Sequence, residues 1–169
     1  PGKTSSQFKI ALSGIVDNPS RPNRKLNIEI FDPENNNAKI ADLATDITND
    51  SSVKQFKKIT VLDAIPKSGI YNIKVKSDGY LRKLILSVRI NKGVQNDVAL
   101  ATLIPGDING DNRIDLLDYN LFITCYGIKA NQPTCDKTVL KLADFDDNIV
   151  IDGIDYNTFI KGLSVKEGD

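Results

Sequence analysis

Oxygen-bearing side chains recur at alternate positions in two short segments of this chain, and that spacing suits a hard metal ion. The first segment offers Asp107, Asn109, Asp111, the main-chain carbonyl of Arg113, Asp115 and Asp118. The second offers Asp144, Asp146, Asn148, the main-chain carbonyl of Val150, Asp152 and Asp155. Ca²⁺ takes six to eight oxygen ligands, and a twelve-residue loop supplies them from positions 1, 3, 5, 7, 9 and 12, the ninth often through water. We therefore expect each segment to be a loop that binds one Ca²⁺.

The two segments are copies of one another, displaced by 37 residues. They agree at loop positions 1, 8, 9 and 12, and again in the run Asp-Tyr-Asn-x-Phe-Ile that begins at Asp118 and at Asp155. Each loop holds four ligand carboxylates, and without a cation these like charges would oppose folding. A solvated acidic surface is the alternative, but it does not explain the ligand spacing or the apolar residue at position 8. Mg²⁺ fits less well because it demands strict octahedral geometry.

Two positions depart from the usual calcium loop. Position 6 normally holds glycine in a left-handed turn. Asn112 tolerates that conformation, but the β-branched Ile149 should resist it. We therefore expect the second loop to be strained, weaker in affinity or bent differently. Position 12 is aspartate in both loops, where ordinary EF-hands use glutamate.

Apolar residues around the loops predict how the loops pack. Ile114 and Ile151, both at position 8, are expected to join the loops in a short two-stranded bridge. Phe122, Phe159 and Ile160 recur at helical spacing, which predicts that they belong to the core between two exiting helices.

The rest of the chain must position these loops, and it has the pattern of β-structure. Apolar and polar residues alternate at 8–12, 26–30, 71–75 and 84–90, as in strands that turn one face toward a core. Turn-forming clusters separate the runs. Less regular runs near 38–46, 53–62 and 96–103 predict three more strands. Seven short strands favour a seven-stranded antiparallel β-sandwich.

We expect two domains, a β-sandwich at 1–104 and a loop-helix unit at 105–169, in a fold that is mainly β with a small α part. The pattern changes after Ile104-Pro105-Gly106, where Asp/Asn-rich loops begin to precede helical patterns. Because no Gly/Ser-rich tether separates the two parts, they are expected to pack as one rigid body.

The composition of the chain argues against several classes of function. Residues 1–104 carry 16 basic and 10 acidic residues, whereas 105–169 carry 6 basic and 12 acidic ones. Solvated strand faces explain the lysines of the basic part better than nucleic-acid binding does. The chain has no histidine, no nucleophile motif and no Gly-rich phosphate loop. Clustered carboxylates could resemble the catalytic pair of a glycosidase, but their positions are already explained by the spacing of calcium ligands. We expect no enzyme, no nucleic-acid partner and, since no long apolar stretch exists, no membrane insertion.

The two cysteines, Cys125 and Cys135, lie ten residues apart. No CxxC pair or histidine supports a zinc site. Either the cysteines form one local disulfide, which would indicate an extracellular or cell-surface location, or they are two small buried residues. The Gly/Asn/Pro-containing connection between them favours the disulfide.

The run Gly106-Asp107-Ile-Asn109-Gly-Asp111, aspartate at position 12 and the duplicated loop and exiting helix resemble dockerin domains, over residues 105–165. The resemblance implies that calcium folds two loop-helix units into a near-two-fold unit that binds a cohesin domain on another protein. A β-sandwich directly before a dockerin resembles the X-module–dockerin pairs of cellulosomal proteins. Within the sandwich, 68–75 followed by 78–81 resembles transthyretin-like and carboxypeptidase-regulatory-like domains, which are mostly structural or adhesive.

The resemblance also places partner-reading residues just before position 12 and along each exiting helix. These are Leu116, Leu117, Ile123 and Thr124 in the first unit, and Gly153, Ile154, Ile160 and Lys161 in the second. Dockerins commonly carry Ser/Thr pairs at the first two places, where this chain has Leu-Leu and Gly-Ile. The family's cohesin preference is therefore not carried over, and the unlike faces argue against symmetric dual-mode binding.

The leading hypothesis is a secreted or cell-surface, calcium-dependent protein-interaction module, monomeric when unbound, that binds a cohesin-like partner. The alternative keeps two Ca²⁺ but no partner, and makes the loop-helix pair a stabilised structural or adhesive terminus packed on its own sandwich. Exposure of Leu116 and Leu117 would favour the first hypothesis, and their burial against residues 1–104 the second.

Overall fold

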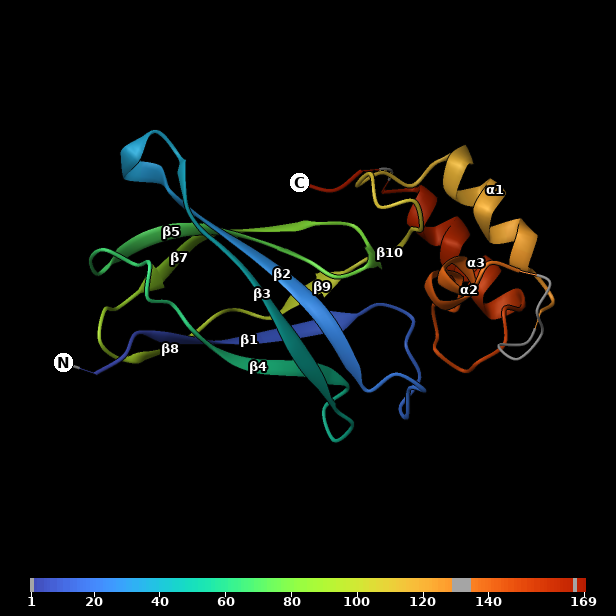
Figure 1. Ribbon diagram of the computed structural model, residues 1–169, viewed down its shortest axis with the longest axis horizontal. Coiled ribbons are helices and arrows are strands. Elements are labelled where there is room, and N and C mark those ends of the chain that lie inside the picture. The colour runs from blue at the N-terminus through green and yellow to red at the C-terminus, as the bar shows by residue number, and fades with distance from the viewer. Residues whose placement is uncertain (1, 129–134, 166) are drawn as a thin grey trace.

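The computed structural model describes residues 2–128, 135–165 and 167–169, and shows a rolled β-sheet with a small helical part at one end (Figure 1). The strands are β1 (Ser5–Leu12), β2 (Asn23–Asp32), β3 (Ala38–Asp50), β4 (Gln55–Val61), β5 (Gly69–Lys76), β6 (Gly79–Tyr80), β7 (Lys83–Ile90), β8 (Gln95–Asp97), β9 (Ala101–Leu103) and β10 (Pro105–Asp107). The helices are α1 (Leu116–Cys125), α2 (Lys137–Ala143) and α3 (Gly153–Leu163), with a 3-10 turn at η1 (Pro33–Asn35). The fold is mainly β with a small α part, as the sequence predicted.

The period-two alternation of the sequence builds the main core. Phe8 and Ile10 of β1 are fully buried, while their neighbours in the strand are half-buried. On β2, Ile28 lies opposite Val75 of β5, and both side chains are buried. Apolar residues that alternate along neighbouring strands therefore meet on one face of the sheet and close a single core.

The strand arrangement corrects the expected seven-stranded antiparallel sandwich. Among the described residues, one sheet holds eight strands in the order β7-β5-β2-β3-β4-β1-β8, and β9 also pairs with β1. The strand expected at 96–103 is divided into β8 and β9, which both run parallel to β1 and pair with successive parts of it. β7, at one end of the strand order, also contacts β9, so the sheet is rolled like a barrel. The rolled sheet encloses its core in the way that the two layers of a sandwich would. The parallel pairing of β8 and β9 with β1 joins segments that lie far apart in the chain, so the local alternation of residues does not predict it.

A second, smaller sheet connects the two parts of the molecule. β10 pairs with β6 so that Pro105 lies opposite Tyr80 and Asp107 opposite Gly79. The first residue of the first predicted loop is therefore fixed by backbone pairing to the β-part. Neither was predicted as a separate strand with these bounds, because segments of two or three residues carry no periodic pattern.

The helices have their own core, separate from the core of the β-part. Phe122 of α1, Phe145 of the second loop and Phe159 of α3 are fully buried, and their rings stack with centroids 5.6–6.3 Å apart. Phe122 and Phe159 thus lie in the core as expected, but Ile160 is 43% exposed and its predicted core position is wrong. Ile160 follows Phe159 directly, so the helix turns it about 100° away from the core face.

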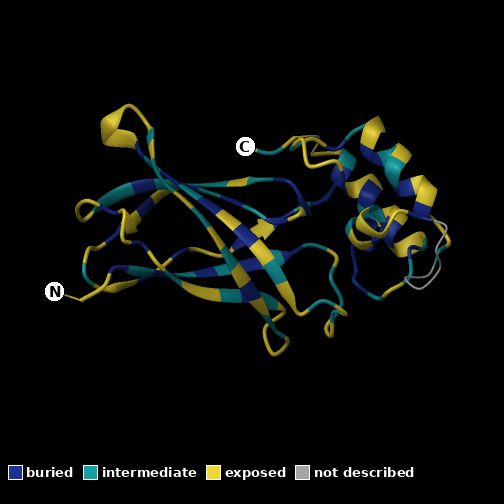
Figure 2. Ribbon diagram, viewed as in Figure 1, coloured by how far each residue is buried: buried dark blue, intermediate teal, exposed yellow. Residues whose placement is uncertain are grey.

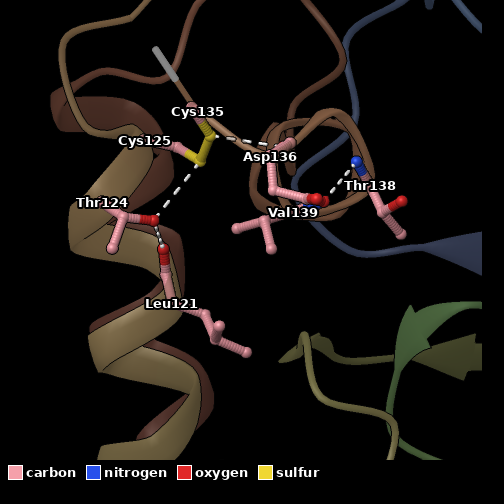
Figure 3. The surroundings of a disulfide bond; sticks show 7 residues. All are labelled: Leu121, Thr124, Cys125, Cys135, Asp136, Thr138 and Val139. Atoms are coloured by element: carbon pink, nitrogen blue, oxygen red, sulfur yellow. Dashed lines mark hydrogen bonds between the residues drawn. A yellow bond between two sulfur atoms is a disulfide. The ribbon is translucent and has the colours of Figure 1, made fainter.

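A disulfide joins Cys125, the last residue of α1, to Cys135, with the two Cα atoms 5.3 Å apart (Figure 3). The next residue, Asp136, begins α2 by accepting hydrogen bonds from Thr138 N (2.8 Å) and Val139 N (3.1 Å). The disulfide therefore ties the end of α1 to the start of α2, a short helix in the connection that the sequence analysis did not predict.

Candidate metal centre

The first predicted loop runs from β10 into α1, and its last ligand position organises the backbone. Asp118 accepts hydrogen bonds from Ile108 N (2.8 Å) and Asn109 N (3.0 Å) through one oxygen and from Asp115 N (3.0 Å) through the other. Asp118 is fully buried. It therefore links the start of the loop to the first turn of the helix.

The second loop repeats this pattern residue by residue. Asp155 accepts from Phe145 N (2.7 Å), Asp146 N (3.2 Å) and Asp152 N (3.0 Å), and it is fully buried. Because equivalent donors meet equivalent oxygens, the 37-residue sequence repeat is also a structural repeat.

The remaining ligand positions form turns in which a side-chain oxygen accepts from the backbone N–H two residues further on. Asn109 accepts from Asp111 N (2.9 Å) and Asp111 from Arg113 N (2.8 Å). In the second loop Asp146 accepts from Asn148 N (3.1 Å) and Asn148 from Val150 N (2.8 Å). Asp115 and Asp152 are the N-caps of α1 and α3.

The donor set fits a hard divalent cation. In the second loop, carboxylate oxygens of Asp144, Asp146 and Asp155 lie within 4.8 Å of one another, and all three residues are buried. In the first loop, Asp107 Oδ1 is buried with no hydrogen-bond partner, while its Oδ2 accepts from Lys76 Nζ (2.6 Å) and Asn112 N (3.1 Å). Unpaired buried carboxylate oxygens are costly, and calcium coordination would satisfy them.

The same crowding raises the pKa of several of these carboxyl groups. Burial raises the pKa values of Asp118, Asp144 and Asp146, and backbone hydrogen bonds oppose the shift. Neighbouring carboxylates add to it, whereas the charge of Arg21 lowers the pKa of Asp144. Burial raises the pKa of Asp155 to about 6, and the charge of Asp146 adds to the shift. Removing these charges from water without a counter-ion is thus unfavourable in the metal-free protein.

We expect calcium affinity at the second loop to fall as the pH falls below about 6. The pKa of Asp155 in the folded, metal-free protein lies above its ordinary value of 3.8, so the metal-free form gains a proton and stability as the pH falls through 6. Calcium requires the ionised carboxylate and must then displace this proton. Between pH 7 and 5 the Kd should rise by roughly tenfold from Asp155 alone. Calorimetric titrations at both pH values would measure the change; equal Kd values would contradict it.

The backbone at position 6 shows how the second loop accommodates Ile149. Asn112 and Ile149 have φ angles of 71° and 75°, so both loops make the left-handed turn and the second is strained rather than bent differently. A left-handed conformation costs an L-residue roughly 1–2 kcal/mol, and least for asparagine or aspartate. Ile149 is 54% exposed, so little buried contact offsets that cost.

Ile149→Asn is therefore expected to stabilise the protein by about 1 kcal/mol in urea unfolding with calcium present. Val165→Asn is the matched control, since Val165 is similarly exposed at 47% and does not have a positive φ. Equal effects of the two substitutions would show that the turn is unstrained.

The expected bridge between Ile114 and Ile151 is not formed. Ile151 N donates to Ile128 O (3.3 Å), and Ile151 O accepts from Gly127 N (2.9 Å). In the first loop it is Arg113 that forms a bridge, and its partner is Glu167. Both isoleucines are buried in the helical core, so they pack the two units together through side chains instead of the backbone.

Basic side chains of the β-part hold both loops, a feature that the sequence analysis missed. Asp147, at position 4 of the second loop and fully buried, pairs with Arg21 Nε (2.5 Å) and Arg24 Nη2 (2.8 Å). Arg21 also donates to Asp144 O (3.0 Å). Burial alone would raise the pKa of Asp147, but hydrogen bonds and charge from Arg21 and Arg24 outweigh it and lower the pKa. The signal available in the sequence was Asp147 itself, an acidic residue at a loop position that supplies no calcium ligand.

The predicted partner-reading residues belong to α1 and α3, and both helices have exposed segments along their length (Figure 2). Leu116 is 69% and Leu117 60% exposed. The other members, Ile123, Thr124, Gly153, Ile154, Ile160 and Lys161, are also exposed. The two leucines are therefore not buried against residues 1–104.

Comparison with known proteins identifies the architecture. No protein-family model matches the sequence, and no curated protein sequence matches it. The structure is similar to two crystal structures of a type II cohesin–X-dockerin complex from Acetivibrio cellulolyticus, one a mutant of the C-terminal interface (TM-score 0.64) and one a mutant of the N-terminal interface (TM-score 0.59). Each is 17% identical over 94% of this chain and 94% of that chain. The likeness is one of fold.

The likeness extends over nearly the whole chain, so it includes the β-part and the helical part together. Among the described residues, no helix has the length and apolar character needed to cross a membrane.

Proposed function

We propose that this chain is a non-catalytic, calcium-dependent protein-interaction module, in which the loop-helix pair binds a cohesin-like domain. The observation that carries the proposal is the exposure of apolar side chains in the first turns of α1 and α3: Leu116, Leu117 and Ile154 are each more than half exposed. These residues occupy positions 10 and 11 of the loops, next to the proposed ligands. Neighbouring exposed apolar residues, such as Leu116 and Leu117 in the first turn of α1, are typical of protein–protein interaction sites.

The structural comparison supports a component of such a complex, and the sequence pattern favours the dockerin side. The related structures contain cohesin and X-dockerin, and only the dockerin sequence pattern matches the duplicated loops of this chain. In this assignment the rolled sheet takes the place of the X-module. The Cys125–Cys135 disulfide supports an extracellular or cell-surface location, since such bonds persist in oxidising compartments.

Calcium would be held in the first loop by Asp107, Asn109, Asp111, the carbonyl of Arg113, Asp115 and Asp118. In the second it would be held by Asp144, Asp146, Asn148, the carbonyl of Val150, Asp152 and Asp155. The ion would supply charge to the buried carboxylates and fix the direction in which α1 and α3 leave the loops. The helices would then present their apolar faces in a defined arrangement, which lowers the entropy cost of binding.

The second candidate is a calcium-stabilised structural terminus, and the ion pairs of Asp147 and Asp107 with the β-part favour it. These contacts leave Leu116 and Leu117 exposed. Packing on the β-part is therefore compatible with partner binding, and the exposed leucines favour the interaction module.

The direct test is binding of the purified chain to a type II cohesin domain, with calcium and with EGTA. Binding should require calcium, and Leu117→Arg should weaken it by about thirtyfold, as expected for a central interface residue. Leu86→Arg is the control, because Leu86 is 64% exposed on β7 of the β-part and should leave the Kd unchanged.

Absence of binding to a panel of cohesin domains, together with intact calcium binding, would instead favour the structural terminus. Equal losses for Leu117→Arg and Leu86→Arg would place the interface elsewhere.

A further inference from the structure

A lysine of the β-part contacts one of the proposed calcium ligands directly. Lys76 Nζ donates to Asp107 Oδ2 (2.6 Å) and to Gly110 O (3.2 Å). Asp107 is position 1 of the first loop; its side chain is fully buried, and that of Lys76 is only 21% exposed. Among the described residues, Asp107 is the only proposed ligand whose carboxylate forms an ion pair with a basic side chain.

Paired strands hold the two partners of this ion pair in place. Lys76 is the last residue of β5, and a turn in which Tyr80 N donates to Ser77 O (3.1 Å) leads from it into β6. β6 pairs with β10 so that Gly79 lies opposite Asp107. Because the strands already fix both backbones, forming the ion pair orders little additional chain.

The two carboxylate oxygens of Asp107 have different surroundings. Oδ2 accepts from Lys76 Nζ and from Asn112 N (3.1 Å), whereas Oδ1 is buried with no hydrogen-bond partner. Oδ1 is therefore the oxygen open to a metal ion, and Lys76 contacts the other oxygen of the same group. A calcium ion and the ammonium group would share one carboxylate, and partial burial leaves their repulsion only partly screened.

The second loop is arranged differently at the equivalent position. Asp144 accepts from Asn148 N and Ile149 N, each at 3.1 Å, and no basic side chain of the described residues forms an ion pair with it. The arginines of the β-part pair instead with Asp147, which is not at a ligand position. The β-part therefore forms an ion pair with a ligand carboxylate only in the first loop.

We propose that Lys76 sets the calcium affinity of the first loop, an inference that rests on the calcium binding proposed above. Lys76 neutralises Asp107 in the metal-free protein and repels the ion that the same carboxylate binds. It therefore stabilises the metal-free loop and lowers its calcium affinity. Because such coupling is reciprocal, calcium reduces the contribution of Lys76 to stability by the same factor.

The test is an NMR titration of the full chain with calcium. Asn112 N and Ile149 N each donate to the position-1 carboxylate of their own loop, so their amide signals report the two sites separately. Lys76→Gln should lower the Kd of the first site by about five- to tenfold, as expected for the loss of one charge that repels a divalent ion at high effective dielectric. The Kd of the second site should not change.

Two variants control for charge and for the strand itself. Lys74→Gln removes the same charge from the same strand, at a residue that forms no ion pair with either loop among the described residues, and should change each Kd by less than about twofold. Lys76→Arg keeps the charge and should not tighten binding. Urea unfolding adds a second measurement: the stability lost in Lys76→Gln should be larger in EGTA than in calcium, whereas a purely structural contact would lose the same in both.

The outcomes separate this inference from the proposed function. Unchanged or weaker binding at the first site of Lys76→Gln, with calcium bound normally by the wild-type chain, would overturn the role of Lys76 and leave the calcium-dependent module intact. No response of either amide signal to calcium in the wild-type chain would overturn both. If Lys76→Gln fails to fold, Lys76→Met, which keeps the apolar stem, must bind calcium more tightly at the first site than the wild-type chain does.

Discussion

Removal of calcium with EGTA is expected to lower the melting temperature of this protein by roughly 10–20 °C. A ligand at about 100 times its Kd stabilises the folded state by about 2.7 kcal/mol per site. For a chain of this size, each kcal/mol corresponds to roughly 2–4 °C. The physical source is the set of buried carboxylates, Asp144, Asp146 and Asp155 in the second loop and Asp107 and Asp118 in the first, whose repulsion the ion relieves. Circular dichroism with and without EGTA would measure both the melting temperature and the helical signal.

A pair of variants makes this prediction specific to the loops. Asp107→Asn should reduce the calorimetric stoichiometry from two Ca²⁺ to one, because a neutral side chain then occupies position 1 of the first loop. Asp63→Asn removes the same charge from an exposed position outside both loops and should keep two. A melting temperature indifferent to EGTA, or two ions bound by Asp107→Asn, would contradict the assignment.

Asp147→Asn is expected to reduce the free energy of unfolding by about 3 kcal/mol, although position 4 of the loop is not a ligand position. The substitution leaves Arg21 and the buried Arg24 without their shared counter-charge, and breaking a buried ion pair typically costs this much. Asparagine accepts the positive φ of 67° at this position, so the change tests the charge and not the turn. Urea unfolding in calcium would measure the loss.

A double-mutant cycle distinguishes the buried ion pair from general destabilisation. Arg24→Met combined with Asp147→Asn should recover part of the lost stability, because an apolar side chain removes the unpaired charge. Asp97→Asn breaks an exposed pair with Lys9, 3.5 Å apart, and should cost less than about 1 kcal/mol. Similar losses for Asp147→Asn and Asp97→Asn would show that the contact between the two parts contributes little.

Both predictions concern how the helical unit is held. The ligand carboxylates gather charge within each loop, while Asp147 and the arginines of the β-part secure the second loop from outside. Because Asp147 lies between two proposed ligands, Asp146 and Asn148, and Arg21 also donates to Asp144 O, the ion pairs and calcium at the second loop should be coupled.

The local patterns of the chain determined most of its secondary structure. Alternation along 8–12, 26–30, 71–75 and 84–90 predicted strands that the structure contains, because each has one buried face and the period of a strand is local. The repeat at Asp107–Asp118 and Asp144–Asp155 predicted two equivalent loops, since the same side chains make the same short-range hydrogen bonds. For Ile149 at position 6 the sequence left strain, weaker affinity and a different bend open, and the structure has the left-handed turn.

Tertiary structure alone decided how these elements meet. The parallel return of β8 and β9 along β1 and the pairing of β10 with β6 depend on residues far apart in the chain, which leave no local period. Arg24 and Asp147 lie 123 positions apart, and as single charged residues each resembled a solvated surface group. Only folding removes both from water, and burial turns two ordinary charges into a strong contact between the two parts.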